Sequence, residues 1–241
     1  MDEAKLAVLR RWLSEAKRIV FFGGAGTSTE SGIPDFRGVD GLYHQQFSQP
    51  PETIISHSFY KKNPKVFFDF YRSRMLYPQA KPNAAHIKLA QWEREGRLLA
   101  VVTQNIDGLH QMAGSKNVFE LHGSVHRNVC LRCGAGYDLA AFMALEHVPV
   151  CPRCGGAVKP DVVLYEEALD GDTISGALDA IRRADVLIVG GTSLTVYPAA
   201  AFLDEYPGNR LVLINKTPTK RDDLANLTLH EGLGDVFSRL N

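Results

Sequence analysis

The chain has 241 residues, 45% of them apolar, which is enough for one substantial α/β core with a smaller appended module and too apolar for a disordered chain. Lysine plus arginine and aspartate plus glutamate balance at 27 each, so no global charge recruits nucleic acid or an anionic membrane. The longest apolar runs have the length of β-strands, which predicts no membrane-spanning helix. We therefore expect a partner to bind at a local site.

The amino-terminal segment predicts an amphipathic helix. Leu6, Leu9 and Leu13 recur at helical spacing among charged residues, and the segment lacks the unbroken apolar stretch of a signal peptide. This pattern predicts a cytoplasmic protein.

Short apolar runs separated by helical patterns predict a parallel sheet. The first run ends in Gly23 and Gly24, as a buried strand does where it enters a tight turn. Strands that alternate with helices are typical of a doubly wound, Rossmann-like α/β fold. The predicted strands are residues 19–22, 98–103, 118–121, 186–189 and 211–215.

Two helices carry recognisable ends. Asn63 followed by Pro64 predicts an N-cap with proline at the first helical position, for a helix that runs to about residue 75. Gly96 closes a second helix, which contains His86 and Trp92.

Two stretches interrupt the alternation of strands and helices. Residues 35–78 are aromatic and helical, and residues 128–159 contain all the cysteines. We expect both to form a smaller lobe, with a ligand cleft between the lobes at the carboxyl ends of the strands. The predicted division is a Rossmann-like nucleotide-binding lobe (1–34, 79–127 and 160–241), a helical insertion with a cofactor-binding loop (35–78) and a zinc-ribbon module (128–159).

The cysteines form two pairs with metal-ligand spacing. Cys130 and Cys133 are followed after seventeen residues by Cys151 and Cys154, a spacing that lets four thiolates surround one zinc ion. Four thiolates leave no open position for water or substrate, so a zinc ion here is expected to be structural. The alternative is a coincidental group of buried cysteines.

The loop after the first strand has the composition of a nucleotide-binding turn. Gly24, Ala25 and Gly26 let the backbone approach a pyrophosphate, although a bare Gly-x-Gly is often only a turn. A hydride-transferring Rossmann protein shows a helix, a strand and then an acidic residue for the ribose, whereas here Pro34 stops any helix. Phe36 and Arg37 are expected on a loop that covers the nucleotide.

Polar residues follow the other predicted strands. Residues 104–107 (QNID), His122, residues 190–193 (GGTS) and Asn215 all lie where carboxyl ends of parallel strands meet. A neutral imidazole at His122 can act as a general base near pH 7. The alternatives are a helix cap at Asn105 or Asp107 and a structural histidine.

These motifs together resemble the sirtuins, NAD-dependent protein lysine deacylases, over nearly the whole chain. The matching segments, in family order, are residues 24–38 (GAGTSTESGIPDFRG), 104–107, His122-Gly123, the cysteine quartet, Gly191-Thr192-Ser193 and Asn215. The resemblance implies that NAD is consumed: the nicotinamide bond breaks, and the acyl oxygen of a modified lysine attacks the exposed ribose carbon. The products would be nicotinamide, O-acyl-ADP-ribose and free lysine.

The resemblance also implies a role for each matching residue. His122 would be the general base on a ribose hydroxyl, and Asn105, in the nicotinamide pocket, would be the second catalytic residue. Zinc would be one structural ion. The implied NAD contacts are Gly24, Ala25, Gly26 and Thr29 at the phosphates and ribose, Asp35, Phe36 and Arg37 over the cofactor, Gln104, Asn105, Ile106 and Asp107 at the nicotinamide, and Gly191, Thr192, Ser193, Asn215 and Asp235 at the adenosine half.

In this family the acyl-lysine peptide pairs as an added strand between the lobes. The matching segment is Val162, Val163, Leu164 and Tyr165. The usual pattern continues Phe-Gly-Glu, whereas this chain has Tyr165-Glu166-Glu167, which adds a charge near the peptide path.

Tyr71 and Arg74 are three residues apart on one predicted helix and resemble the pair by which one sirtuin branch recognises succinyl or malonyl carboxylates. The alternative is a solvated helix face.

Other functions stay open from the sequence. They are an NAD(P) oxidoreductase with structural zinc, a protein ADP-ribosyltransferase on the same fold and a zinc-ribbon binding module. The neutral charge argues against nucleic acid as a partner. A monomer is expected.

Overall fold

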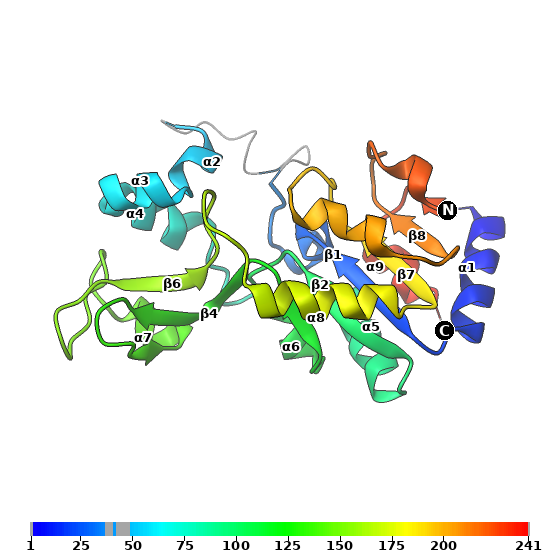
Figure 1. Ribbon diagram of the computed structural model, residues 1–241, viewed down its shortest axis with the longest axis horizontal. Coiled ribbons are helices and arrows are strands. Elements are labelled where there is room, and N and C mark those ends of the chain that lie inside the picture. Colours follow the sequence, from blue (N-terminus) through cyan, green and yellow to red (C-terminus); the bar gives the residue numbers. More distant parts are fainter. Residues whose placement is uncertain (1, 37–40, 42–48, 241) are drawn as a thin grey trace.

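The structure is a computed structural model that describes residues 2–36, 41 and 49–240. Figure 1 shows two lobes joined through the middle of the molecule, with the smaller lobe on the left. In the part of the chain that is described, no helix has both the length and the apolar character needed to cross a membrane.

The large lobe is built on a six-stranded sheet in which all strands are parallel, in the order β3-β2-β1-β7-β8-β9. Read in chain order, this is the 3-2-1-4-5-6 order of a Rossmann-like sheet, and it confirms the predicted fold class. The five predicted strands are confirmed, and a short sixth strand was missed. The bounds are β1 (Ile19–Gly23), β2 (Leu98–Thr103), β3 (Val118–Glu120), β7 (Val186–Gly190), β8 (Leu211–Ile214) and β9 (Leu227–Leu229).

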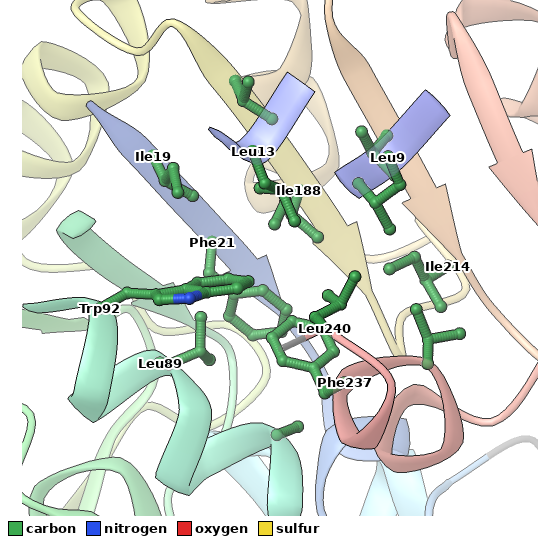
Figure 2. Packing of buried hydrophobic residues seen from close by; sticks show 14 of the residues in the cluster. Leu9, Leu13, Ile19, Phe21, Leu89, Trp92, Ile188, Ile214, Phe237 and Leu240 are labelled. Carbon is green, nitrogen blue, oxygen red and sulfur yellow. The ribbon is translucent and has the colours of Figure 1, made fainter. Parts of the chain in front are cut away.

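Helices cover both faces of this sheet. For this reason β1, β7 and β8 are buried along their whole length. One face packs against α1 (Glu3–Glu15), α5 (Ala84–Arg94) and α9 (Leu233–Ser238). Figure 2 shows Phe21 of β1, Leu89 and Trp92 of α5 and Phe237 of α9 meeting in this cluster. The other face packs against α8 (Gly171–Arg182) and the 3₁₀ helix η4 (Ala199–Glu205).

The helical insertion and the cysteine module share one core in the small lobe. Aromatic rings from the insertion (Tyr60, Phe67, Phe68 and Tyr71) share one cluster with Phe142 of the cysteine module, and Phe68 and Tyr71 contact Phe142 directly. The sheet order is β5-β4-β6, with antiparallel pairs. The elements are α2 (Pro51–Ile54), α3 (His57–Lys62), α4 (Pro64–Arg74), β4 (Gly123–Cys130), β5 (Gly136–Tyr137), α7 (Leu139–Met143) and β6 (Val158–Val162).

Both predicted helix ends are confirmed. Asn63 is the N-cap of α4 and Pro64 begins the helix, as predicted, although the Asn63 side chain makes no capping hydrogen bond. Gly96 follows α5 with φ of +74°, a left-handed conformation that glycine adopts at little cost.

Candidate functional site

A cavity of about 1090 Å³ lies at the carboxyl ends of β1, β2, β7 and β8 and extends to the small lobe. Ligand pockets usually measure about 300–1,000 Å³, so this cavity has the size of a large ligand site. It occupies the crevice where a doubly wound sheet binds its ligand.

Most of the predicted site residues line this cavity. Two do not, Tyr71 and Asp235, and Arg37 lies outside the residues that the structure describes. The cysteines lie elsewhere, in the ribbon of the small lobe. The predicted residues on the cavity wall are Gly24, Ala25, Gly26, Thr29, Asp35, Phe36, Arg74, Gln104, Asn105, Ile106, Asp107, His122, Val162, Val163, Leu164, Tyr165, Gly191, Thr192, Ser193 and Asn215.

The predicted nucleotide loop (residues 24–32) packs closely against the loop that follows β7. The Gly26 amide donates to the carbonyl of Gly191 at 2.8 Å, and a Cβ on Gly26 would lie 2.7 Å from the Gly191 Cα. That neighbour is backbone and cannot swing aside. Glycine is therefore required at position 26 for the two loops to meet and form one wall of the cavity.

We expect Gly26→Ala to weaken NAD binding by about tenfold or more, because strain of about 1–3 kcal/mol must move one of the two loops. Calorimetric titration with NAD measures the effect. Gly136→Ala is the matched control, since nothing lies within 4 Å of a Cβ at that exposed glycine. Equal NAD affinity in the two variants would contradict the packing argument.

The hydroxyl of Ser28, to which the sequence assigns no role, joins two of the predicted residues. The fully buried Ser28 donates from Oγ to Oδ2 of Asp107 at 2.7 Å and accepts from Nδ2 of Asn105 at 3.0 Å. Asp107 also accepts from the amide of Leu109, the first residue of α6 (Leu109–Ala113), at 2.9 Å, while Gly108 holds the N-cap position of that helix. Asp107 therefore contacts both Ser28 and the start of α6.

His122 lies just after β3, at the edge of the cavity. Its Nδ1 is 2.8 Å from the carbonyl oxygen of Gln104, which can only accept, so Nδ1 carries the proton and Nε2 keeps its lone pair. Burial lowers the pKa of His122 below its usual value, although the bond to Gln104 acts in the opposite direction. The imidazole is therefore neutral at pH 7 and can accept a proton at Nε2.

Asn215 follows β8 and Thr192 follows β7, and hydrogen bonds between these two cavity-lining residues connect the two strand ends. The Asn215 side chain accepts from the Thr192 amide at 3.0 Å and donates to the Thr192 carbonyl at 2.8 Å. The Thr192 hydroxyl accepts from Gln104 at 3.1 Å. Asn215 therefore shapes this wall through the loop that it holds.

The four cysteine sulfurs all lie within 4.8 Å of one another. Four thiolates around zinc at about 2.3 Å are separated by about 3.8 Å, and Cys130 to Cys154 and Cys133 to Cys151 measure 3.5 and 3.8 Å. The Tyr137 hydroxyl donates to the Cys151 sulfur at 3.0 Å, as an outer partner of a metal ligand does. The four residues are positioned to bind one zinc ion with no open coordination position.

Glu166 lines the cavity together with Val162–Tyr165, so its carboxylate places a charge near the proposed peptide path, as the sequence predicts. Its carboxylate accepts from the amide and the hydroxyl of Ser58, at 2.8 and 2.9 Å, near the start of α3. The backbone there has φ of +74°, unusual for a residue other than glycine. The two contacts hold residues 162–167 against the helical insertion.

The structure does not bring Tyr71 and Arg74 together at the cavity. Arg74 lines it, whereas Tyr71 is fully buried in the small-lobe core between Phe67 and Phe142. The Tyr71 hydroxyl has no hydrogen-bond partner, and burial raises its pKa well above the usual value. Residues three apart share a helix side, but here that side meets both the core and the cavity.

Comparisons with known proteins agree with this geometry. A family model described as the Sir2 family matches residues 24–198. The NAD-dependent protein deacetylase of Clostridium acetobutylicum is 55% identical over 236 residues, which cover 97% of this chain and 96% of that protein. The protein of the same name from Staphylococcus epidermidis is 42% identical and covers 100% of this chain and 98% of its own.

Solved structures of Sir2 proteins superpose closely on this fold. One described as Sir2 with a p53 peptide and NAD⁺ has a TM-score of 0.86 at 37% identity, and it covers 98% of this chain and 96% of its own. Another, a Sir2 variant with a deacetylated p53 peptide and 3′-O-acetyl-ADP-ribose, has a TM-score of 0.89 at 37% identity, with the same coverage of 98% and 96%.

Proposed function

The chain belongs to the Sir2 family, and we propose that its inter-lobe cavity removes acetyl groups from protein lysine side chains at the expense of NAD. The observation that carries this proposal is the neutral His122 at a cavity edge that also holds Asn105 and Asp107. The relatives described above carry the name NAD-dependent protein deacetylase. The products of the proposed reaction are nicotinamide, O-acyl-ADP-ribose and free lysine, and the Sir2 complex with a deacetylated peptide and 3′-O-acetyl-ADP-ribose supports them.

NAD supplies an activated ribose carbon, and its positively charged nicotinamide leaves with little need of acid assistance. The site therefore has to orient two substrates, exclude water and provide one base. Ser28 fixes Asn105 and Asp107 on the nicotinamide side, and Nε2 of His122 takes a proton from a ribose hydroxyl.

The acyl-lysine peptide is proposed to pair with Val162–Tyr165, which line the cavity. The Sir2 structure with a p53 peptide and NAD⁺ supports a peptide as the second substrate. Pairing through the backbone makes the preference for peptide sequence broad. The cytoplasmic location, the monomeric state and the division into segments remain predictions.

The direct test mixes the protein with NAD and an acetyl-lysine peptide and measures free nicotinamide and loss of acetyl mass together. Deacetylation predicts equal amounts of both. An NAD(P) oxidoreductase would leave NAD unbroken, and an ADP-ribosyltransferase would add ADP-ribose to a protein without removing acetyl. No nicotinamide release with any acyl peptide would refute the proposal.

The pH dependence follows from the state of His122. Its neutral form is the base, and burial moves its pKa below 6.5, so the active form predominates throughout the range from pH 7 to 8. We expect kcat/KM for the peptide to be flat there and to fall by about tenfold per unit once the pH drops below that lowered pKa. An acid limb centred above pH 7 would contradict the assignment.

We expect acetyl-lysine to be preferred over succinyl-lysine by about tenfold or more, because the hydrogen bond that Tyr71 would give to a carboxylate, worth about 1.5–3 kcal/mol, is not available at the cavity. Rates on matched acetyl, malonyl and succinyl peptides measure this preference, and Tyr71→Phe is expected to leave it unchanged. Efficient removal of succinyl groups that is lost in the Arg74→Ala variant would contradict this prediction. Arg74 would then be the residue that recognises the carboxylate of the acyl group.

A further inference from the structure

The nucleotide loop, residues 24–32, contains only the short 3₁₀ turns η1 (Ala25–Thr27) and η2 (Thr29–Ser31). Its shape therefore depends on contacts from other parts of the chain. The Gly26 amide bonds to Gly191, and the carboxylate of Glu30 accepts from the Gly234 amide at 3.0 Å. A third contact comes from Asn83, which precedes α5 and does not line the cavity.

Asn83 uses the two ends of its side-chain amide for two different purposes. Its oxygen accepts from the Ala85 amide at 3.0 Å and so caps α5. Its nitrogen donates to the carbonyl of Thr27 at 2.8 Å and to the hydroxyl of Ser31 at 3.0 Å. One rigid group thus ties the start of a core helix to both turns of the nucleotide loop.

The helix that carries Asn83 is firmly anchored. Ala85 and Leu89, which follow on α5, are fully buried in the main core of the large lobe. Position 83 is therefore a fixed point, and the loop takes its place relative to the sheet through the two bonds that the amide nitrogen donates. Thr27 is itself buried, at 1% exposure, so water does not easily replace the bond to its carbonyl.

We propose that Asn83 is a positioning residue for NAD: it holds the nucleotide loop in its binding shape without touching the ligand. The proposal rests on the NAD site assigned above. It requires a donor at the side-chain nitrogen, whereas the helix cap requires only an acceptor. Asparagine supplies both, and aspartate would supply the cap alone.

The test is therefore Asn83→Asp, which changes one atom. The variant keeps an excellent N-cap, but turns an oxygen toward the Thr27 carbonyl where a donor stood. We expect its melting temperature to stay within a few degrees of the wild type. We expect the Kd for NAD from calorimetric titration to rise about tenfold or more, since one net hydrogen bond corresponds to about three- to tenfold and a repulsion is added.

Two further variants calibrate this result. Ser31→Ala removes one of the two tethering bonds and keeps the cap, so about a threefold rise in the Kd is expected. Asn63→Asp is the matched control, because Asn63 holds the same N-cap position at α4 but makes no capping bond and does not line the cavity. It is expected to bind NAD as the wild type does.

Hydrogen exchange of the free protein gives a readout that needs neither NAD nor turnover. Asn83→Asp is expected to speed exchange in residues 24–32, while amides of α5 stay protected. The KM for the acetyl-lysine peptide is expected to change less than twofold.

Asn83→Asp with an NAD Kd within twofold of the wild type, or with unchanged exchange in the loop, would overturn the proposal. Equal losses of protection in α5 and in the loop would also overturn it, because Asn83 would then only stabilise the fold. If the wild type failed to bind NAD, the proposed function would fail, and the exchange experiment would still decide whether the tether exists.

Discussion

Replacing His122 by alanine is expected to lower the rate of lysine deacetylation by about 10²- to 10⁴-fold, the usual contribution of a general base. The imidazole is the neutral group whose Nε2 is left free to accept a proton, because Gln104 occupies Nδ1. Alanine leaves no acceptor at this position of the cavity. Steady-state kinetics with an acetyl-lysine peptide at pH 7.5 measure the loss in kcat.

The same variant should fold normally. It loses one hydrogen bond to a backbone carbonyl, which costs about 0.5–1.5 kcal/mol. We therefore expect the melting temperature to fall by only a few degrees. His147→Ala is the matched control: this exposed histidine contacts Asp69 in the small lobe and does not line the cavity. It should keep full activity. A His122→Ala enzyme that turned over within tenfold of the wild type would remove His122 from the reaction.

A partial reaction refines the test. In the proposed sequence His122 takes a proton from a ribose hydroxyl only after the bond to nicotinamide has broken. Exchange of labelled nicotinamide into NAD, in the presence of acetyl peptide, should therefore fall less than deacetylation does. Equal losses in both assays would mean that His122 acts earlier, in orienting NAD or in closing the cavity.

The positions of the site residues could be predicted because parallel strands end at a common edge. Gly24, Gln104, His122 and Asn215 each follow a run that is recognisable as a buried strand, and the topology then brings them to one cavity. Strand β9 was missed because Thr228 separates its two leucines, so the segment contains no continuous apolar run.

The sequence could not show which side chains from distant parts of the chain pack against a given residue. The spacing of Tyr71 and Arg74 correctly predicts one side of α4, but the rings of Phe67 and Phe142 enclose Tyr71 and leave only Arg74 at the cavity. The contact between Glu166 and Ser58 likewise depends on the fold and has no signal in the sequence. Ser28 lies inside the predicted loop, yet only the fold places Asn105 and Asp107 beside it.

Removing zinc is expected to unfold the small lobe and abolish activity. Cys130 and Cys151 are buried at 1% exposure in the same core as Phe67, Phe68 and Val158, so the metal and this core stabilise each other. Structural zinc sites supply about 10–16 kcal/mol in isolated zinc-finger peptides, more than the whole stability of many domains. Cys151→Ser should have the same effect as a strong chelator.

The chain offers a way to watch each lobe separately. Its two tryptophans, Trp12 in α1 and Trp92 in α5, both pack against the large-lobe core. After chelation we expect tryptophan emission to change little, while amides of β4 and β6 lose protection from hydrogen exchange. Zinc should restore both protection and activity, and magnesium should restore neither, because thiolates favour the softer ion.

Loss of activity then follows from geometry, since the zinc takes no part in the reaction. Val162 and Leu164 belong to the small-lobe core and also line the cavity, so unfolding that core removes one wall and the edge on which the peptide is proposed to pair. NAD affinity should fall less than peptide affinity, because the nucleotide loop and the strand ends belong to the large lobe. A zinc-free protein that kept both its exchange protection and its turnover would show that hydrogen bonds and packing alone hold the ribbon together.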